Sequence, residues 1–267
     1  MTNAVYQISA FNYAFDSENK IHSDDVASNY GFEGGLVPGV ADFAYLLRAA
    51  HAAWGAEWLH HGTIEARFLK PVYHRQIVSA TARADEADDG ALVLELVNRE
   101  NVVCAVGRAT RTPSDPAPTV DAFPACSGPV TRADPSVAGC PAGMALGDYE
   151  YDYVAQAAYI EATQRFAEPF SDKQDRPLWH PATCLHDANR CLRASVALGP
   201  WIHTGSAMQL YGAPADGERI SLRGRVRETF VKNGHTRTTL DLAWFADERG
   251  VARIRHDAII ALAGISG

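Results

Sequence analysis

Near the start of the chain, His22 is the residue best suited to proton transfer. Its imidazole titrates near neutral pH, and the carboxylates of Asp16, Glu18 and Asp25 lie close to it in sequence. A histidine that a carboxylate positions can act as a general acid or base. The same histidine could instead cap the backbone amides of Asp24 or Asp25 in a loop. The residue types alone are consistent with both interpretations.

A second stretch, Pro38-Gly39-Val40, could bind a ligand through its backbone amides. These residues open a predicted helix, and the first amides of a helix have no partner within it. Gly39 has no side chain and lets a ligand carbonyl approach closely, so we expect this turn to polarise a carbonyl as an oxyanion site. The glycines Gly34, Gly35 and Gly39 are equally consistent with a chain that only needs freedom to begin the helix.

The helix after this turn is predicted by the spacing of its apolar residues. Apolar side chains recur at helical intervals from Val40 to Ala50, with Pro38 in the first turn and Gly55 just past the end. Segments with β-type composition follow at residues 63–69, 77–84, 91–97 and 102–110. A helix followed by an antiparallel meander is an α+β arrangement in which the helix packs on the sheet.

The second part of the chain repeats this order. With an offset of 143 positions, residues 38–77 align without a gap, and the identical pairs include Trp58 with Trp201 and His60 with His203. The repeated helix is predicted over 181–196, with strands at 206–212, 220–230, 236–245 and 251–262. Tight hairpin turns are predicted at Asp89-Gly90 and Asn233-Gly234. The sequence therefore predicts a tandem duplication of one unit.

A proline-rich stretch separates the two copies. Residues 113–147 hold seven of the 14 prolines, which cannot donate to a β-ladder or sit inside a helix. We expect this stretch to be a linker that runs extended over the surface. The predicted domains are therefore 1–112 and 148–267.

Three stretches in this layout resemble the MaoC-like (R)-specific enoyl-CoA hydratases and dehydratases. They are Glu-Asn-Lys-Ile-His at 18–22, Tyr-Gly-Phe-Glu-Gly-Gly-Leu-Val-Pro-Gly at 30–39 and Arg-Phe-Leu-Lys-Pro-Val at 67–72. The resemblance implies a double hot-dog fold, in which an antiparallel sheet wraps a central helix and two such units pair. Here one chain would supply both units, each with its own sheet.

The family's catalytic signature is Gly-Asp-x-Asn-Pro-(Leu/Ile)-His, in which the Asp and the His share one water. Alignment on Asn19 and His22 puts Ser17 at the aspartate position and Lys20 at the proline position. Asp16 lies one residue earlier, so only a bulge or a loop could bring it to the His22 side. The catalytic residues that the resemblance implies are His22 and Asp16, with Glu18 or Asp25 as substitutes for Asp16. We expect the substrate-binding residues to be Asn19, Gly35, Pro38, Gly39 and Val40.

The reaction implied is the addition or removal of water on an α,β-unsaturated acyl thioester. The substrate would be an acyl-CoA or an acyl-carrier thioester, with no further cofactor. Two other functions are consistent with the sequence. One is a hot-dog acyl-CoA thioesterase, in which a carboxylate activates water to attack the carbonyl. The other is a non-catalytic acyl-binding protein, because Ser17 and Lys20 replace the aspartate and the proline of the signature. The sequence identifies neither the acyl group nor whether two chains associate as a homodimer.

Composition excludes several other partners. The formal net charge is −8 and there is no basic stripe, so nucleic acid would be repelled. The uncharged residues 195–213 include Pro200 and His203 and would not suit a membrane. Cys184, His186 and Cys191 fit no standard zinc pattern, so we expect no metal. The first ten residues lack the pattern of a secretion signal, so we expect a cytoplasmic protein with free thiols.

Overall fold

Ten strands form one antiparallel sheet in the computed structural model of this chain, which describes residues 4–128, 131–166, 170–171 and 176–263. The strands of the first half are β1 (Ala4–Ser9), β2 (Thr63–Phe68), β3 (Ile77–Asp85), β4 (Asp88–Asn98) and β5 (Val103–Thr110). Those of the second half are β6 (Tyr149–Asp152), β7 (Ile202–Leu210), β8 (Arg219–Lys232), β9 (His235–Ala246) and β10 (Arg249–Ala261). The four strands predicted in each half are confirmed, most of them to within a few residues.

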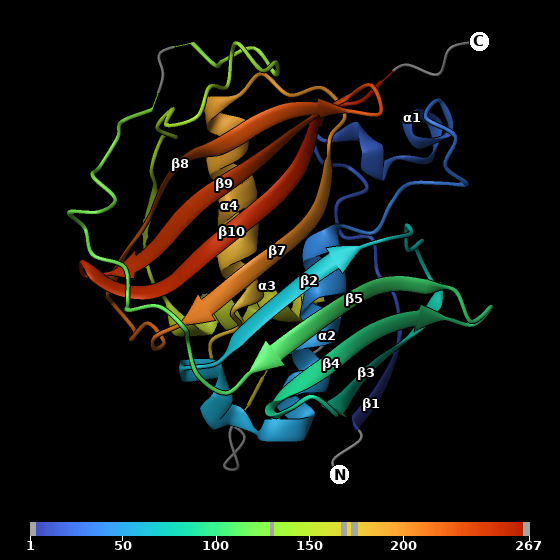
Figure 1. Cartoon of the computed structure of the whole chain (residues 1–267), viewed down its shortest axis with the longest axis vertical. Coiled ribbons are helices and arrows are strands. Elements are labelled where there is room, and N and C mark those ends of the chain that lie inside the picture. The colour runs from blue at the N-terminus through green and yellow to red at the C-terminus, as the bar shows by residue number, and fades with distance from the viewer. Residues whose placement is uncertain (1–3, 129–130, 167–169, 172–175, 264–267) are drawn as a thin grey trace.

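The sheet has an internal two-fold pattern that confirms the duplication. Its order is β1-β3-β4-β5-β2-β7-β10-β9-β8-β6, so both halves read the same from the centre outward. At the centre β2 pairs with β7, where Thr63 faces Gln209 and Ala66 faces Ser206. Ser206 and Gln209 lie 143 positions after Thr63 and Ala66, so the register obeys the offset found in the sequence. The two predicted sheets are therefore joined through β2 and β7 into one (Figure 1).

One long helix from each half packs on the same side of the sheet (Figure 1). The helices are α1 (Asp24–Ser28), α2 (Gly39–Trp54), α3 (Ala155–Phe166) and α4 (Ala182–Ser195), with 3-10 turns η1 (Lys20–His22) and η2 (Ala56–His60). Helix α2 is buried on most of its surface, with Phe43, Leu46 and Leu47 fully inaccessible. It ends at Gly55, whose φ of 81° is a left-handed conformation that glycine adopts without strain.

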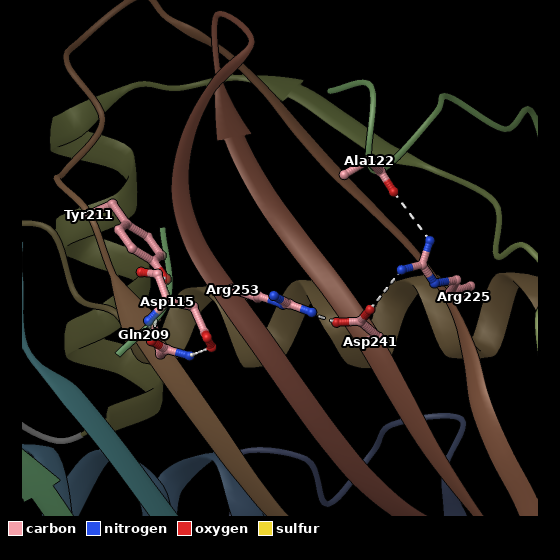
Figure 2. A network of polar contacts seen from close by, with 7 residues as sticks. All are labelled: Asp115, Ala122, Gln209, Tyr211, Arg225, Asp241 and Arg253. Carbon is pink, nitrogen blue, oxygen red and sulfur yellow. Dashed lines mark hydrogen bonds and ion pairs between the residues drawn. The ribbon is translucent and has the colours of Figure 1, made fainter. Parts of the chain in front are cut away.

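Residues 115–123 of the proline-rich stretch lie on the opposite face of the sheet, over the second half, whereas Ala133 and Gly147 bond to Ser195 at the end of α4. Figure 2 shows Asp115 against Gln209, whose amide donates to the Asp115 carboxylate at 2.7 Å. Farther along, the carbonyl of Ala122 accepts from Arg225 at 3.2 Å. Phe123 packs on Phe245 of β9. Polar and aromatic contacts thus fix this first part to the strands, but Cys140 and Leu146 are buried in the core, so the later part does not run over the surface as predicted.

One of the two predicted hairpin turns is correct. At Asn233-Gly234 the φ values are 52° and 78°, and positive φ at both positions is typical of a type I′ turn. The prediction for Asp89-Gly90 is wrong, because β3 and β4 are joined at residues 86–87. Asp85 of β3 lies opposite Asp88 of β4, and Arg108 of β5 forms ion pairs with both. The turn therefore ends before Asp89.

The structure also contains β1, β6 and α3, which the sequence pattern does not predict. The two strands are the edges of the sheet, and each pairs with a single neighbour, β1 with β3 and β6 with β8. Helix α3 contacts α2 of the other half. In the described part of the chain, no helix combines the length and the apolar character that a membrane crossing needs.

Candidate functional site

A cavity of about 220 Å³ lies where the two halves meet, and we call it the apolar cavity. Most of its wall is aliphatic or aromatic, including Phe32, Leu36, Phe68, Ile202 and Ile259. Of the residues predicted for the site, it is lined by Asn19, His22, Pro38 and Gly39. Such a site, apolar with a few polar groups, is typical of a small-molecule pocket.

His22 is held in one orientation at the wall of this cavity. Its Nδ1 lies 2.8 Å from the carbonyl oxygen of Leu36, and its Nε2 lies 3.3 Å from the Nδ2 of Asn19. Because a carbonyl only accepts, this contact assigns the ring proton to Nδ1 and leaves a lone pair on Nε2. Burial lowers the pKa of His22, although the bond to Leu36 opposes that shift. The ring is therefore neutral near pH 7 and suited to accept a proton.

Asn19 connects the His22 loop to the second half of the chain. Its Nδ2 donates to the Trp201 carbonyl at 3.0 Å, and its Oδ1 accepts from the Trp201 amide at 3.2 Å. The same Oδ1 also accepts from the Ile21 amide, which caps η1. Asn19 was predicted to bind substrate. In the structure its polar atoms are engaged with protein groups, and its direct role is to position His22.

The start of α2 places backbone donors at the same cavity. The amides of Ala41 and Asp42 both donate to the carbonyl of Pro38, at 2.8 and 3.4 Å. Within the described residues, the structure shows no acceptor for the amides of Gly39 and Val40. Gly39 lines the cavity, whereas the side chain of Val40 is fully buried in the core. The Gly39 amide is therefore the donor at this turn that is best placed for a ligand oxygen.

Gly39 has neighbours that leave no room for a side chain. A Cβ at this position would lie 2.7 Å from the Phe68 ring and 3.0 Å from His203 Nδ1. We expect Gly39→Ala to lower the free energy of unfolding by about 1–3 kcal/mol, as overpacked core substitutions do. Gly199→Ala is the matched control, because a Cβ there meets nothing within 4 Å. Urea denaturation measures both, and equal stabilities would contradict the close packing at Gly39.

The structure does not bring the predicted carboxylates to the cavity. Asp16 is exposed on a tight turn that the bond from the Ser17 amide to the Ala14 carbonyl closes at 2.9 Å. Glu18 is also exposed and pairs with Arg193 at 3.5 Å, and Asp25 is exposed on α1. The bulge or loop that Asp16 needed to reach the His22 side is therefore not formed.

Gly35 is placed apart from the apolar cavity as well. Its amide donates to Asp24 at 2.7 Å, and a Cβ on it would lie 2.1 Å from the His22 carbonyl oxygen. The glycine lets two backbone segments pack closely, which is a structural role rather than contact with a ligand in this cavity. It supports the loop that carries His22.

Asp42, which the sequence analysis did not consider, lines the apolar cavity from the first turn of α2. Only 4% of its surface is exposed, and its Oδ1 is buried without a hydrogen-bond partner in the structure. Burial raises the pKa of this carboxyl well above its ordinary value and so favours its protonated form. The signal in the sequence was a lone acid between Val40, Ala41 and Phe43 on a helix that is otherwise apolar.

His203 lines the cavity from the second half. Its Nε2 lies 3.1 Å from the Gly205 carbonyl and 2.8 Å from Ser206 Oγ, and Ser206 Oγ lies 3.0 Å from His256 Nδ1. Burial and the neighbouring His256 keep the pKa of His203 well below its ordinary value. His60 lies at the matching position of the first copy, 143 residues earlier, but it does not line this cavity. The two histidines therefore have different surroundings.

No three His, Cys, Asp or Glu side chains come together as metal ligands anywhere in the described ranges. The five cysteines form no disulfide bond. Among the groups at the apolar cavity are a neutral imidazole, a buried carboxyl and a helix amide.

No protein-family model and no curated protein matches the sequence. A protein from Chloroflexus aurantiacus, provisionally assigned as a MaoC domain dehydratase, is similar in structure, with 13% identity, a TM-score of 0.69 and coverage of 98% of this chain and 95% of that one. A Mycobacterium tuberculosis protein described as a double hot dog has 12% identity and a TM-score of 0.62, with 97% and 96% covered. A provisionally assigned oleoyl thioesterase from Lactobacillus plantarum has 8% identity and a TM-score of 0.56, with 99% and 98% covered. These structural neighbours, together with the two-fold sheet, identify the chain as a double hot-dog protein.

Proposed function

We propose that this protein is a hydro-lyase that adds water to, or removes it from, an α,β-unsaturated acyl thioester. The observation that carries the proposal is the neutral His22, which faces the same apolar cavity as the Gly39 amide. A base beside an oxyanion donor is what hydration of an enoyl thioester needs, because water must lose a proton while charge develops on the thioester oxygen. The MaoC-like and polyketide dehydratases among the structural neighbours support this reaction class.

In this proposal each group has one role. The Gly39 amide donates to the thioester oxygen, and His22 Nε2 takes a proton from water as the oxygen of that water bonds to Cβ. Asp42 then gives its proton to Cα, which converts the enolate into the saturated thioester. The proton on His22 returns to Asp42 through solvent and completes the cycle. A lowered pKa on the base and a raised pKa on the acid suit these two assignments.

The lining of the apolar cavity suits an acyl thioester as well. Phe32, Phe68 and Ile202 offer an apolar wall, while Lys70 and Arg237 contribute positive charge to the same cavity. Lys70 is exposed, so it is available to a phosphate of CoA or of a carrier-protein prosthetic group. Asp16 has no role in this proposal, because its side chain faces solvent.

Product analysis with crotonyl-CoA tests the function. We expect loss of the enoyl absorbance with the CoA thioester intact, and 3-hydroxybutyryl-CoA as the product. Release of free thiol would support the thioesterase alternative instead. Tight binding without either reaction would support an acyl-binding protein and contradict the hydro-lyase proposal.

The pH dependence of this reaction follows from the surroundings of His22. Desolvation makes its protonated form less stable, so its pKa lies below the ordinary value of 6.5. We expect kcat/KM to decline at low pH as the base gains a proton, with a midpoint below 6.5. Initial rates with crotonyl-CoA between pH 4.5 and 8 measure this limb. A midpoint above 6.5 would contradict the assignment of His22 as the buried base.

A further inference from the structure

A second cavity, also of about 220 Å³, adjoins the apolar cavity, and we call it the arginine cavity. Three cations line it: Arg165 of α3, and Arg190 and Arg193 of α4. None of the described residues that line it carries a carboxylate. Its wall shares five residues with the apolar cavity, namely Asn19, His22, Pro38, Asn189 and Trp201. The proposed base therefore stands between an apolar space and a cationic one.

The polar wall of the arginine cavity comes from one face of α4. His186, Asn189, Arg190 and Arg193 are spaced as i, i+3, i+4 and i+7, so they share a helix face, and all of them line the cavity. The positions 143 residues earlier in α2 are Phe43, Leu46, Leu47 and Ala50, all of them buried core residues. The second copy thus has a polar and cationic face where the first copy has core, and that face borders a cavity beside His22.

The acids that pair with these arginines do not line the cavity, and one of them is Glu18, which lies 3.5 Å from Arg193. Glu161 forms ion pairs with Arg165, at 2.5 Å, and with Arg190, at 3.6 Å. Asp187, at 3.3 Å from Arg190, also accepts from Trp244 Nε1 and from the Tyr151 hydroxyl, each at 3.0 Å. The three arginines therefore line the cavity together, while the acids that pair with them are not among the described residues of its wall.

The positive potential inside the cavity has an effect on a neighbouring group. His186 lines the cavity, and its pKa lies well below the ordinary value, first because of burial and then because of Arg165, Arg190 and Arg193. The positive charge of the three arginines opposes protonation of His186, and the same charge would favour a bound anion. Arg side chains are the usual partners of carboxylates because their guanidinium matches a carboxylate in geometry.

We propose that the arginine cavity binds a carboxylate at the end of the acyl group, so that the preferred substrates are thioesters of short dicarboxylic acids. This inference rests on the proposed function, which places the acyl group beside His22 and the Gly39 amide. Pro38, at the start of α2, and His22 line both cavities, so a short acyl chain held at that turn has the arginine cavity as its neighbour. A carboxylate there would meet three guanidinium groups.

Calorimetric binding of two saturated thioesters of equal length tests the inference without any turnover. We expect glutaryl-CoA, which ends in a carboxylate, to bind at least about tenfold more tightly than pentanoyl-CoA, because charge-assisted bonds to arginine form only with the former. Equal affinities of the wild-type protein for the two thioesters would overturn the inference and leave the proposed function standing. Failure of both thioesters to bind would overturn the inference and the proposed function together.

Two single variants locate the preference. Arg165→Gln and Arg193→Gln should each reduce the advantage of glutaryl-CoA by about tenfold and leave pentanoyl-CoA binding unchanged. Arg83→Gln is the control, because Arg83 lies on β3 in an exposed pair with Glu95. Circular dichroism and thermal unfolding establish that each variant is folded. An advantage that persists in both cavity variants would overturn the assignment.

The phosphates of CoA are the other source of negative charge, and pantetheine thioesters distinguish them from an acyl carboxylate. We expect glutaryl-pantetheine to keep its advantage over pentanoyl-pantetheine, and to lose it in Arg193→Gln. If the arginines bind phosphate instead, the variants will weaken pentanoyl-CoA as much as glutaryl-CoA and will have no effect on either pantetheine thioester. That result would overturn the carboxylate assignment.

Discussion

Replacement of His22 by glutamine is expected to lower kcat for crotonyl-CoA hydration by about 10²–10⁴-fold, the usual contribution of a positioned general base. Glutamine keeps an amide that can donate to the Leu36 carbonyl, as His22 Nδ1 does at 2.8 Å, but it has no nitrogen that takes up a proton. The loop should therefore keep its structure while the base is lost. Steady-state rates, with circular dichroism on the same samples, measure both effects.

His60→Gln is the matched control for this experiment. His60 precedes β2 in the first half and lines neither the apolar nor the arginine cavity. We expect its kcat to equal that of the wild-type protein. A His22→Gln variant that retains full activity would show that another group, such as His203 in the same cavity, takes the proton from water.

The parts of the fold that could be predicted are those with strong local patterns. The apolar repeat between Pro38 and Gly55 defined α2, because capping residues and periodicity agree at both ends. The offset of 143 positions was also sufficient to predict a two-fold sheet, and the β2–β7 register follows it. Pairing between β2 and β7 was not foreseen, because two exposed edges carry no signal that they will meet.

The edge elements were missed for a different physical reason. Strands β1 and β6 pair on one side only, and their alternation of half-buried and exposed residues is short. Helix α3 is amphipathic only weakly, with Ala162 and Phe166 as its buried residues. Tertiary contacts rather than local pattern stabilise these elements, so the sequence of each one alone predicts little.

Of the groups proposed for the site, the sequence pointed to His22 and the Gly39 turn, which line the apolar cavity, but not to Asp42, the proposed acid. His22 and Gly39 belong to stretches whose residue types suggest chemistry before any fold is known. Asp42 becomes a candidate only once the first turn of α2 is seen to border a cavity, since its burial raises its pKa. Asp16 was favoured for its place in the sequence, yet a local turn directs it to solvent. Distance along the chain was a poor guide to distance in space.

The two halves contribute different groups to the proposed site. In the first half η1 and α2 supply the proposed base and the proposed acid, and α4 of the second half supplies the cationic wall beside them. Asn19 holds the halves together at this point, with two hydrogen bonds to Trp201. A duplicated fold thus leads to one site at the junction, with the second copy free to change the face that the first copy needs for its core.

Asp42→Asn is expected to produce opposite effects on activity and on stability at high pH. Asparagine has nearly the same shape but no proton to give to Cα, so we expect kcat to fall by about 10²-fold or more. Measurement of crotonyl-CoA hydration at pH 7 tests this. Asp25→Asn, which changes an exposed carboxylate on α1, should leave kcat unchanged and serves as the control.

The stability effect follows from the sign of the pKa shift. The folded chain keeps the Asp42 proton to a higher pH than the unfolded chain does, so folding is favoured fully below the ordinary pKa and less as pH rises toward the raised value. In Asp42→Asn this loss is absent. The Tm of the wild-type protein should therefore fall relative to that of the variant between pH 5 and pH 9, as thermal unfolding across that range would measure. A constant difference in Tm would show that Asp42 is already ionised in the folded protein, and an ionised Asp42 could not be the acid.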